Sequence, residues 1–454
     1  MRLYLQLDLV VLALLSHGLA AAAADPALAS QPELHAEVGA EGVTAVRAES
    51  PSAGSASETG APDQPANITN PAVQSASRAL LAAEEELGTE DVALAPTLEA
   101  FAVAQLEAGE YAAAAGTLGR EIELLEKSYG VYDMRLASPL SLLAEVQSAA
   151  GDHAEAIETF QRAQHVVHRA DGVYSLDQLE YIEKMSNSFV AMKNYAEADR
   201  HNRFSFFVSE KKFGPQNPDL VPAILKLADW YRRAGNVRDA RNLYERAVRV
   251  IENARGKDDP GLIEPLLGLG TTAAKKSQYR RQRESALKRM VAIVDAQPDI
   301  DAVDRAGSWA HLGDFYVLIN REALAAEAYE KGWSTLRADP SLPEEQAGLF
   351  SEPKVLNFPK RIYLMDHTPG TPLKGFDMSL VEYQMEVEFE VSIGKDGRVL
   401  TVSVIDLDAS PTTSRQIRRY VREARFRPRI VDGKPVRTDG FRLKEQLTII
   451  RPKV

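Results

Sequence analysis

Three histidines come nearest to the spacing of a metal site. His165 and His168 stand one helical turn apart, and His153 belongs to the same predicted pair of helices. A metal site needs enough ligands and an ordered shell of residues around them. The nearby sequence has no helical Glu-His pair and no cysteine to complete such a set. We therefore predict that the chain binds no metal.

Motifs for covalent or phosphate chemistry are also missing from the sequence. The 454 residues include no cysteine, which excludes disulfides, thiolate nucleophiles, iron–sulfur clusters and cysteine-based zinc sites. There is no Gly-x-Ser-x-Gly elbow and no glycine-rich phosphate loop. The acidic run from Glu84 to Glu86 and the pair Asp258-Asp259 have no apparent partner that would separate their acidities. We predict no catalytic residue, no cofactor and no enzymatic activity.

A period of 42 residues organises the middle of the chain. Pro298 continues a series of glycines at this interval, which are Gly88, Gly130, Gly172, Gly214 and Gly256. A second series keeps the same interval just after short polar turns, at Tyr111, His153, Tyr195, Val237 and Tyr279. In the fourth unit, apolar and small residues recur at three- and four-residue steps on both sides of the turn. This pattern predicts an array of helical hairpins.

Small residues recur where two helices of a hairpin would cross. In first helices they are Ala102, Ala144, Ser186, Ala228, Gly270 and Gly313, and in second helices Ala114, Ala156, Ala198, Ala240 and Ala325. The fifth unit departs with Gln282 in place of alanine, and the sixth is shifted by one residue. These hairpins resemble the tetratricopeptide repeat in the long spacing of kinesin light chains. The resemblance implies a solenoid over residues 72–340, in which Ala72 to Leu87 is a lone second helix that caps the stack.

The same resemblance implies a concave groove, lined by the first helix of each hairpin, that binds a protein partner. Projecting the pattern places seven polar residues there, which are Glu145, Asn187, Asp229, Arg232, Arg233, Thr271 and Lys275. In relatives, an Asn with nearby Lys or Arg often holds a peptide backbone or a terminal carboxylate. Asn187, Arg232 and Lys275 would imitate that arrangement. The alternative is an ordinary solvated face, since surface helices normally expose polar residues.

The amino-terminal segment has the composition of a secretory signal. Residues 1–24 contain Arg2, a short apolar core from Leu9 to Leu15, and a run of alanines that ends at Ala24. Because such a core is too short to cross a bilayer comfortably, we predict a cleaved signal peptide and a soluble periplasmic protein. Retention as an inner-membrane anchor is the alternative. Residues 25–71 are rich in Ala, Ser, Gly, Pro and acidic residues, which predicts a disordered tether.

A different pattern follows the repeats. Residues 341–375 are read as a linker punctuated by Pro and Gly. From Met385 to Ile393 apolar and polar residues then alternate, which predicts a half-buried strand. A turn, a second strand from Val399, a helix that begins at Ser410-Pro411 and a final strand complete the chain. We predict a small α+β domain over residues 376–454 with the order strand, strand, helix, strand.

Four short blocks in this last region carry a second resemblance. They are Val387 to Val391, Asp396 to Val399, Ala424 to Pro428, and Gly433 to Val436. Together they look like the carboxy-terminal domain of TonB-type periplasmic energy transducers. The chain lacks the membrane-spanning helix and the long proline-rich rod of such a transducer. The resemblance implies that the domain binds a partner segment by adding it as a strand to a sheet edge.

Charge is distributed unevenly. The net charge of −12 disfavours nucleic-acid binding, because a polyanion must meet a basic surface. Four arginines nevertheless share the polar side of the predicted final helix, and they are Arg415, Arg418, Arg419 and Arg422. They form either a patch that faces an acidic partner, lipid headgroups or glycan carboxylates, or an ordinary solvated helix face.

The sequence thus predicts a mostly α protein, a tetratricopeptide-like solenoid followed by a TonB-like domain. We expect a periplasmic scaffold whose groove binds one protein of the cell envelope and whose terminal domain binds another. The alternatives are an accessory of TonB-dependent outer-membrane transport, which would bind segments of outer-membrane receptors, and a cell-wall glycan-binding protein. Mass spectrometry that finds residues 1–24 retained would favour the transport accessory, whereas clean cleavage would favour the scaffold.

Overall fold

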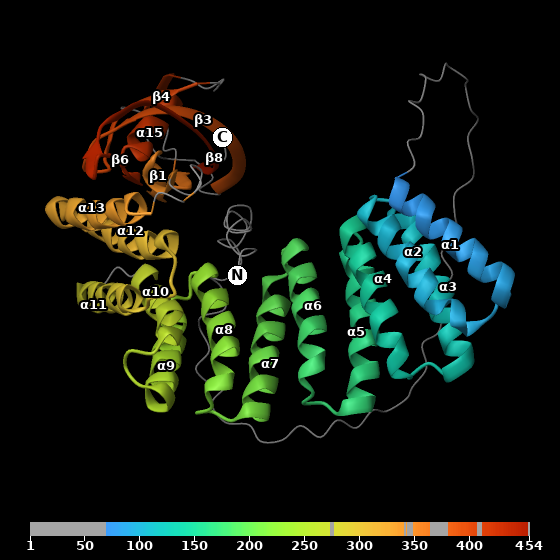
Figure 1. The fold of residues 1–454 in the computed structure, drawn as a ribbon. Helices are drawn as coiled ribbons and strands as arrows, with labels where there is room; N and C mark the ends of the chain where they lie inside the picture. The colour runs from blue at the N-terminus through green and yellow to red at the C-terminus, as the bar shows by residue number, and fades with distance from the viewer. Residues whose placement is uncertain are drawn as a thin grey trace, which may run out of the picture. The chain divides into compact units, whose positions relative to one another are not determined.

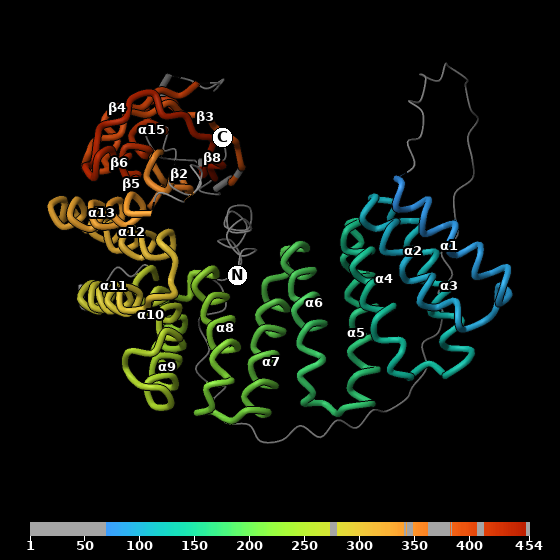
Figure 2. Tube along the Cα trace, in the orientation of Figure 1, coloured from blue at the N-terminus to red at the C-terminus, as the bar shows by residue number. Residues whose placement is uncertain are grey.

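Paired helices make up most of the described residues, and a small region of strands follows them (Figures 1 and 2). The computed structural model describes residues 70–272, 277–339, 342, 348–363, 380–405 and 411–452. The predicted signal peptide and all but the last two residues of the predicted tether lie outside these ranges. Internal contacts divide the chain into two units, with the boundary between Val208 and Ser209.

The unit before the boundary consists of helical hairpins. Its helices are α1 (Pro71–Leu87), α2 (Ala95–Glu107), α3 (Tyr111–Tyr129), α4 (Ala137–Ala150), α5 (His153–Asp171), α6 (Leu179–Ala191) and α7 (Tyr195–Phe213), which runs past the boundary. A short 3-10 turn precedes the first helix of each hairpin. These turns are η3 (Val92–Leu94) before α2, η4 (Met134–Leu136) before α4 and η5 (Leu176–Gln178) before α6. The predicted lone helix is α1, which packs against α2.

The unit after the boundary continues the hairpin pattern. Its helices are α8 (Val221–Arg233), α9 (Val237–Arg255), α10 (Ile263–Thr271), α11 (Ser277–Ala296), α12 (Ala302–Leu318) and α13 (Glu322–Arg337). The 3-10 turns η6 (Pro218–Leu220) and η7 (Pro260–Leu262) precede α8 and α10. The hairpin prediction from the 42-residue period is therefore confirmed over the described helices.

The 42-residue period marks a capped turn between hairpins. Gly130, for example, has φ of 91°, in the left-handed region that glycine tolerates best, and ends α3. Three residues after each such glycine, a polar side chain accepts a hydrogen bond from a backbone amide and so starts the next first helix. These caps are Asp91, Asp133, Ser175, Asn217 and Asp259. Each cap satisfies a backbone donor that the helix itself cannot pair.

The small residues predicted at helix contacts are buried there. Ala144 and Ala228 are fully buried, as are Ala156 and Ala240 on the second helices. At Gly313 an added Cβ would lie 2.3 Å from Cε1 of the buried Tyr329 ring. A larger residue at Gly313 would therefore push the ring away from α12. The prediction that small residues lie at the helix contacts is confirmed at these positions.

An ion pair between consecutive second helices recurs along the array. The pairs are Arg120 with Glu84, Arg162 with Glu126, Arg246 with Glu210, and Arg289 with Glu252. In the intervening unit the two equivalent positions hold His168 and Phe204, so both charges are replaced together. Because most of these side chains are partly exposed, each pair stabilises the array only modestly.

The strands after the helices form a four-stranded sheet in the order β2-β8-β3-β4. β3 (Leu380–Ile393) pairs antiparallel with β8 (Thr438–Pro452) along most of its length, and with β4 (Val399–Val404) on its other side. Helix α15 (Pro411–Val421) buries Ile417 and Val421 against Phe389 and Val391 of β3. The alternation predicted for residues 385–393 is therefore confirmed. Between α15 and β8 lie β5 (Arg425–Arg427), β6 (Arg429–Val431) and β7 (Lys434–Val436).

Two further strands lie in the stretch that the sequence indicated as a linker. β1 (Lys354–Asn357) pairs antiparallel with β5, and β2 (Arg361–Tyr363) pairs parallel with β8. Part of residues 341–375 thus belongs to the sheet region. Both strands are short, and backbone hydrogen bonds pair them with β5 and β8. Because such pairing does not require alternating apolar residues, the sequence gives no sign of these strands.

A buried ion pair joins the strand region to the last hairpin. Arg427 on β5 donates two hydrogen bonds to Asp314 on α12, from Nε to Oδ1 at 2.8 Å and from Nη2 to Oδ2 at 2.6 Å. Tyr329 on α13 donates a third, to Asp314 Oδ1 at 2.9 Å. The side chain of Arg427 is only 2% exposed and that of Asp314 is 12% exposed. Because a buried charge needs a partner, these bonds hold β5 against α12.

The turn between β3 and β4 lies at the same junction. Gly397 has φ of 75°, and an added Cβ would lie 2.1 Å from the carbonyl oxygen of Phe426 and 2.8 Å from Val317 Cγ1. Arg398 Nη2 donates to Asn320 Oδ1 at 3.1 Å. The end of α12 therefore contacts both β5 and the β3–β4 turn.

The Asp314→Asn variant should destabilise the unit that follows the boundary by about 3–5 kcal/mol, because it leaves the buried Arg427 without a counter-charge. Urea unfolding measures this loss. The control is Asp439→Asn, which removes the carboxylate of the exposed Arg437–Asp439 pair and should change stability little. Replacing both buried partners, as Asp314→Leu with Arg427→Met, should recover most of the loss. Equal effects of Asp314→Asn and Asp439→Asn would contradict this role.

Glu121 on α3 predicts a stability that depends on pH. Its side chain is 2% exposed, and its Oε2 has no hydrogen-bond partner among the described residues. Burial, with a contribution from Glu99, raises the pKa of Glu121 from 4.5 to about 8. Folding therefore takes up a proton between these two pKa values, so stability should be greatest below pH 4.5 and fall as pH rises towards 8.

The Glu121→Gln variant should lose this part of the pH dependence, since an amide does not titrate. Unfolding free energies of both proteins at pH 5, 7 and 9 test the point, and the variant should gain on the wild type as pH rises. Glu123→Gln, which changes an exposed carboxylate of the same helix, is the matched control. Parallel pH profiles for wild type and Glu121→Gln would show that Glu121 is ionised in the folded protein.

Candidate partner-binding site

Four of the predicted groove residues occupy the same position on successive first helices. They directly follow the buried small residue of each helix and stand 42 residues apart, as Glu145, Asn187, Asp229 and Thr271. We call this set the groove row. Asn187 and Thr271 are exposed, whereas Glu145 and Asp229 are half-buried. Arg232 and the exposed Arg233 end α8 in the same region as Asp229, and Lys275 lies outside the described residues.

The predicted clamp of Asn187, Arg232 and Lys275 is not assembled within the described part of either unit. Asn187 belongs to the unit before the boundary and Arg232 to the unit after it, while Lys275 is not described. What the structure does bring together is Arg232 and Asp229, with Arg232 Nε 3.1 Å from Asp229 Oδ1. The clamp therefore stays a prediction.

Glu145 is engaged by a lysine that the sequence analysis did not identify. Lys184 Nζ on α6 lies 2.6 Å from Glu145 Oε1 and 2.5 Å from Glu180 Oε1, and it donates to Ser141 Oγ at 3.1 Å. Burial lowers the pKa of Lys184, but the hydrogen bonds and the charge attraction of Glu145 and Glu180 together outweigh burial and raise it. A signal was available, because Lys184 and Lys226 occupy equivalent positions of the 42-residue period.

Asp229 is held by a buried tyrosine of the second helix. Tyr244 on α9 donates its hydroxyl to Asp229 Oδ1, the oxygen that also accepts from Arg232. Burial first, and then Asp229, raises the pKa of Tyr244, so the hydroxyl stays protonated and remains a donor. Glu264 at the start of α10 is close enough for Asp229 to contribute to raising its pKa, after the larger effect of partial desolvation. Two carboxyls and one guanidinium thus meet at this part of the groove row.

The two edges of the described sheet, β2 beside β8 and β4 beside β3, differ in how far they are covered. At the β8 edge, β2 pairs with Thr448 to Ile450, and Thr448 N donates to the carbonyl of Lys360 at 2.7 Å. At the opposite edge, β4 is the last strand of the sheet among the described residues. Only its start is approached, by a single bridge between Arg398 and Arg425. Among the described residues, the β4 edge, with the exposed Leu400 on it, is therefore the less covered edge of the sheet.

The three arginines of α15, and Arg422 in the turn directly after it, are exposed to solvent. Arg415, Arg418, Arg419 and Arg422 are exposed, and none forms an ion pair with a described residue. Arg418 Nε donates to the backbone carbonyl of Ser414 at 3.3 Å. Since Ile417 and Val421 on the other side of the helix are fully buried, the arginines form a positive face that no described acidic residue neutralises.

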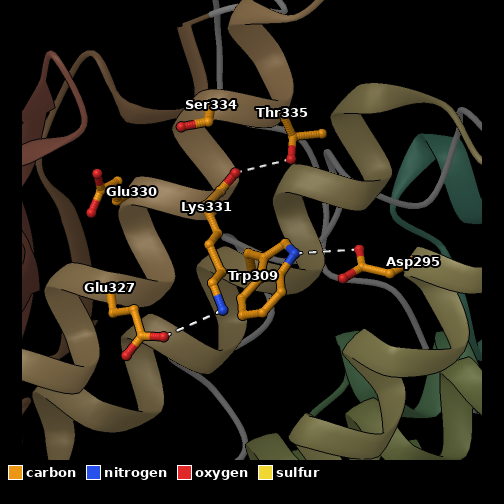
Figure 3. Close-up of a pocket in the computed structure, with 7 residues that line it drawn as sticks. All are labelled: Asp295, Trp309, Glu327, Glu330, Lys331, Ser334 and Thr335. Atoms are coloured by element: carbon orange, nitrogen blue, oxygen red, sulfur yellow. Dashed lines mark hydrogen bonds and ion pairs between the residues drawn. The ribbon is translucent and has the colours of Figure 1, made fainter.

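A pocket of about 630 Å³ lies beside α11, α12 and α13 (Figure 3). Trp309 Nε1 donates to Asp295 Oδ1 at 3.3 Å, and Lys331 Nζ sits 4.6 Å from the centre of the indole ring. Lys331 also lies 3.3 Å from Glu327 Oε1. Figure 3 shows the lysine extended between the indole and Glu327. These groups satisfy one another, so the pocket gives no evidence for a further ligand.

The three histidines whose spacing came nearest to a metal site have other neighbours in the described part of the chain. His165 packs edge-on against Tyr132, and His168 Nε2 contacts Gln178 Oε1. Among the described residues, no group of three His, Cys, Asp or Glu side chains has the geometry to hold a metal ion.

Of the described helices, none combines the length and the apolar character needed to cross a membrane.

The helical array matches known repeats. A family model described as the tetratricopeptide repeat matches residues 219–281. Among solved structures, the chain is similar to BtubC from P. vanneervenii, at 14% identity over 51% of this chain and 91% of that one, with a TM-score of 0.40. It is also similar to a putative kinesin light chain from Podosopora anserina, at 18% identity over 45% and 97% of the two chains, with a TM-score of 0.36.

A third similar structure is the TPR2AB domain of yeast Sti1 in complex with pHSP90, at 12% identity over 56% of this chain and 94% of that one, with a TM-score of 0.22. No curated protein sequence is similar to the chain. The family match shows tetratricopeptide repeats over residues 219–281, and the other described hairpins follow the same 42-residue pattern.

Proposed function

We propose that this protein is a protein–protein interaction scaffold of the bacterial periplasm and has no catalytic activity. Tetratricopeptide repeats suggest a role in binding proteins, and Asp229 and Thr271 of the groove row supply polar side chains to one partner. The strand region, which resembles the carboxy-terminal domain of TonB-type transducers, binds a second partner by strand addition at β4. Export by the signal peptide of residues 1–24 completes the proposal, and its composition supports that step.

The single observation that carries the proposal is the buried junction of Arg427, Asp314 and Tyr329. It joins the strand region directly to the last hairpin through side-chain hydrogen bonds between β5 and α12. A scaffold gains from such a joint because two bound partners are then held at a constant separation. A protein with one binding surface and an unrelated terminal domain has no need for a buried ion pair between them.

Site-specific photocrosslinking in the native host tests the two-partner model. A benzoyl-phenylalanine probe at Arg233 reports on the groove and one at Leu400 on the β4 edge, and a probe at the exposed Arg249 of α9 is the control. The first two probes should capture different proteins in the periplasmic fraction, and a chain with both probes should capture both. Capture of one and the same protein at both sites, or a chain confined to the cytoplasm, would contradict the model.

A second candidate function, binding to an anionic cell-wall glycan, is favoured by Arg415, Arg418 and Arg419 of α15 with Arg422 after it, which have no ion-pair partner among the described residues. The variant Arg418→Glu with Arg422→Glu should lose most of any co-sedimentation with peptidoglycan at low salt, because charge attraction is strongest there. Reversal of Arg238 and Arg249, two exposed arginines of α9, is the control and should have no effect. If the wild type itself stays in the supernatant at low salt, the glycan function is excluded.

A further inference from the structure

At the contact between β5 and α12, an aspartate at the position equivalent to the groove row binds an arginine. Asp314 directly follows Gly313, the small residue of the last first helix, so it continues the groove row after the one-residue shift. Its two carboxylate oxygens accept hydrogen bonds from Arg427, and the hydroxyl of Tyr329 donates a further hydrogen bond to Oδ1. Guanidinium groups match a carboxylate in this two-bond geometry. The protein therefore already binds one of its own arginines through a carboxylate at this position of a first helix.

The same arrangement recurs at Asp229. Tyr244 follows Asp229 by 15 residues, as Tyr329 follows Asp314. Both tyrosines are buried, and each donates its hydroxyl to Oδ1 of its aspartate. At the other members of the groove row, the residue 15 positions later is Phe160, Asn202 or Ala286. Asp229 and Asp314 are thus the two members that share a tyrosine-backed carboxylate.

Asp229 differs from Asp314 in being open to solvent. Its side chain is 39% exposed, against 12% for Asp314. Arg232 contacts it only through Nε on Oδ1, and Oδ2 accepts no hydrogen bond from the described residues. The oxygen that Arg427 Nη2 occupies on Asp314 therefore remains accessible on Asp229.

Local charge favours an incoming cation at the same point. Asp229 contributes to a raised pKa at Glu264, after partial desolvation, which shows that the two carboxyls repel each other. Arg232 is the cation that contacts Asp229 among the described residues. A second guanidinium between Asp229 and Glu264 would relieve the repulsion and complete the two-bond geometry.

We propose that Asp229 is a docking point for an arginine side chain of the protein segment that binds in the groove. The arginine bonds Oδ2 of Asp229 while Tyr244 holds Oδ1, as Arg427 and Tyr329 do at Asp314. This inference rests on the proposed scaffold function and adds to it the chemistry of the first partner, which carries an exposed arginine.

The peptide acetyl-Gly-Arg-Gly-amide, titrated into the full chain, tests the site directly. Its neutral counterpart has citrulline in place of arginine, which keeps the shape and removes the charge. The readout is the NMR signal of the Tyr244 ring, assigned by its loss in Tyr244→Phe. The arginine peptide should shift this signal saturably, and the citrulline peptide should not.

Variants separate the site from general charge effects. Asp229→Asn, which keeps an acceptor for Tyr244, should weaken binding about tenfold, because a charged hydrogen-bonded pair is lost. Arg232→Gln should strengthen binding by removing the internal competitor, and it leaves Asp229 intact. Asp258→Asn, an exposed carboxylate of the same unit, should change nothing.

Equal shifts with both peptides, or arginine binding that Asp229→Asn leaves unchanged, would overturn the docking site. This result is distinct from failure of the scaffold proposal. If the probe at Arg233 captures a partner but the arginine peptide does not bind, the scaffold stands and the docking site falls. If the peptide binds as expected and the probe captures nothing, the docking site stands and the scaffold falls.

Discussion

The buried contact of Arg427 with Asp314 is the interaction on which the rest of this structure depends. A guanidinium and a carboxylate removed from water lose much of their solvation, and only a well-formed pair with further hydrogen bonds offsets that loss. Here the pair has two bonds, and Tyr329 supplies a third to the carboxylate. Burial raises the pKa of Tyr329, so its hydroxyl remains a donor at all ordinary pH values. We therefore expect the strand region to unfold together with the last hairpin of the repeat array.

Regular repetition and local departure have different roles along the array. The capped turns, the small residues and the ladder of Arg–Glu pairs recur because every hairpin must solve the same packing problem. Departures mark positions with their own chemistry. Glu121 is a buried acid where the equivalent residues are Ala163, Ser205 and Ala247. Asp229 and Asp314 are carboxylates backed by tyrosine, and one of them is already occupied by the chain's own arginine.

The parts of the fold that the sequence reveals are those that depend on periodicity. A 42-residue period predicts the hairpins, and the alternation from Met385 to Ile393 predicts β3, because both patterns reflect which side of an element is buried. The strands β1 and β2 escape such reasoning, since backbone bonds to β5 and β8 hold them. The burial of Arg427 also escapes it, because an arginine beside exposed arginines looks like surface until its partner 113 residues away is known. The groove row was predictable as a row, and the period also marks Lys184, but the contacts of Lys184 with Glu145 and of Tyr244 with Asp229 required the three-dimensional structure.

The central claim is that α12 and the sheet unfold as one body because a buried ion pair joins them. Native-state hydrogen exchange measures this most directly, by comparing the amides of residues 302–318 with those of residues 380–393. Our account predicts the same opening free energy, and the same dependence on denaturant, for both sets. Protection of β3 that persists under conditions where α12 exchanges freely would show that the strand region is an independent domain and would contradict the account.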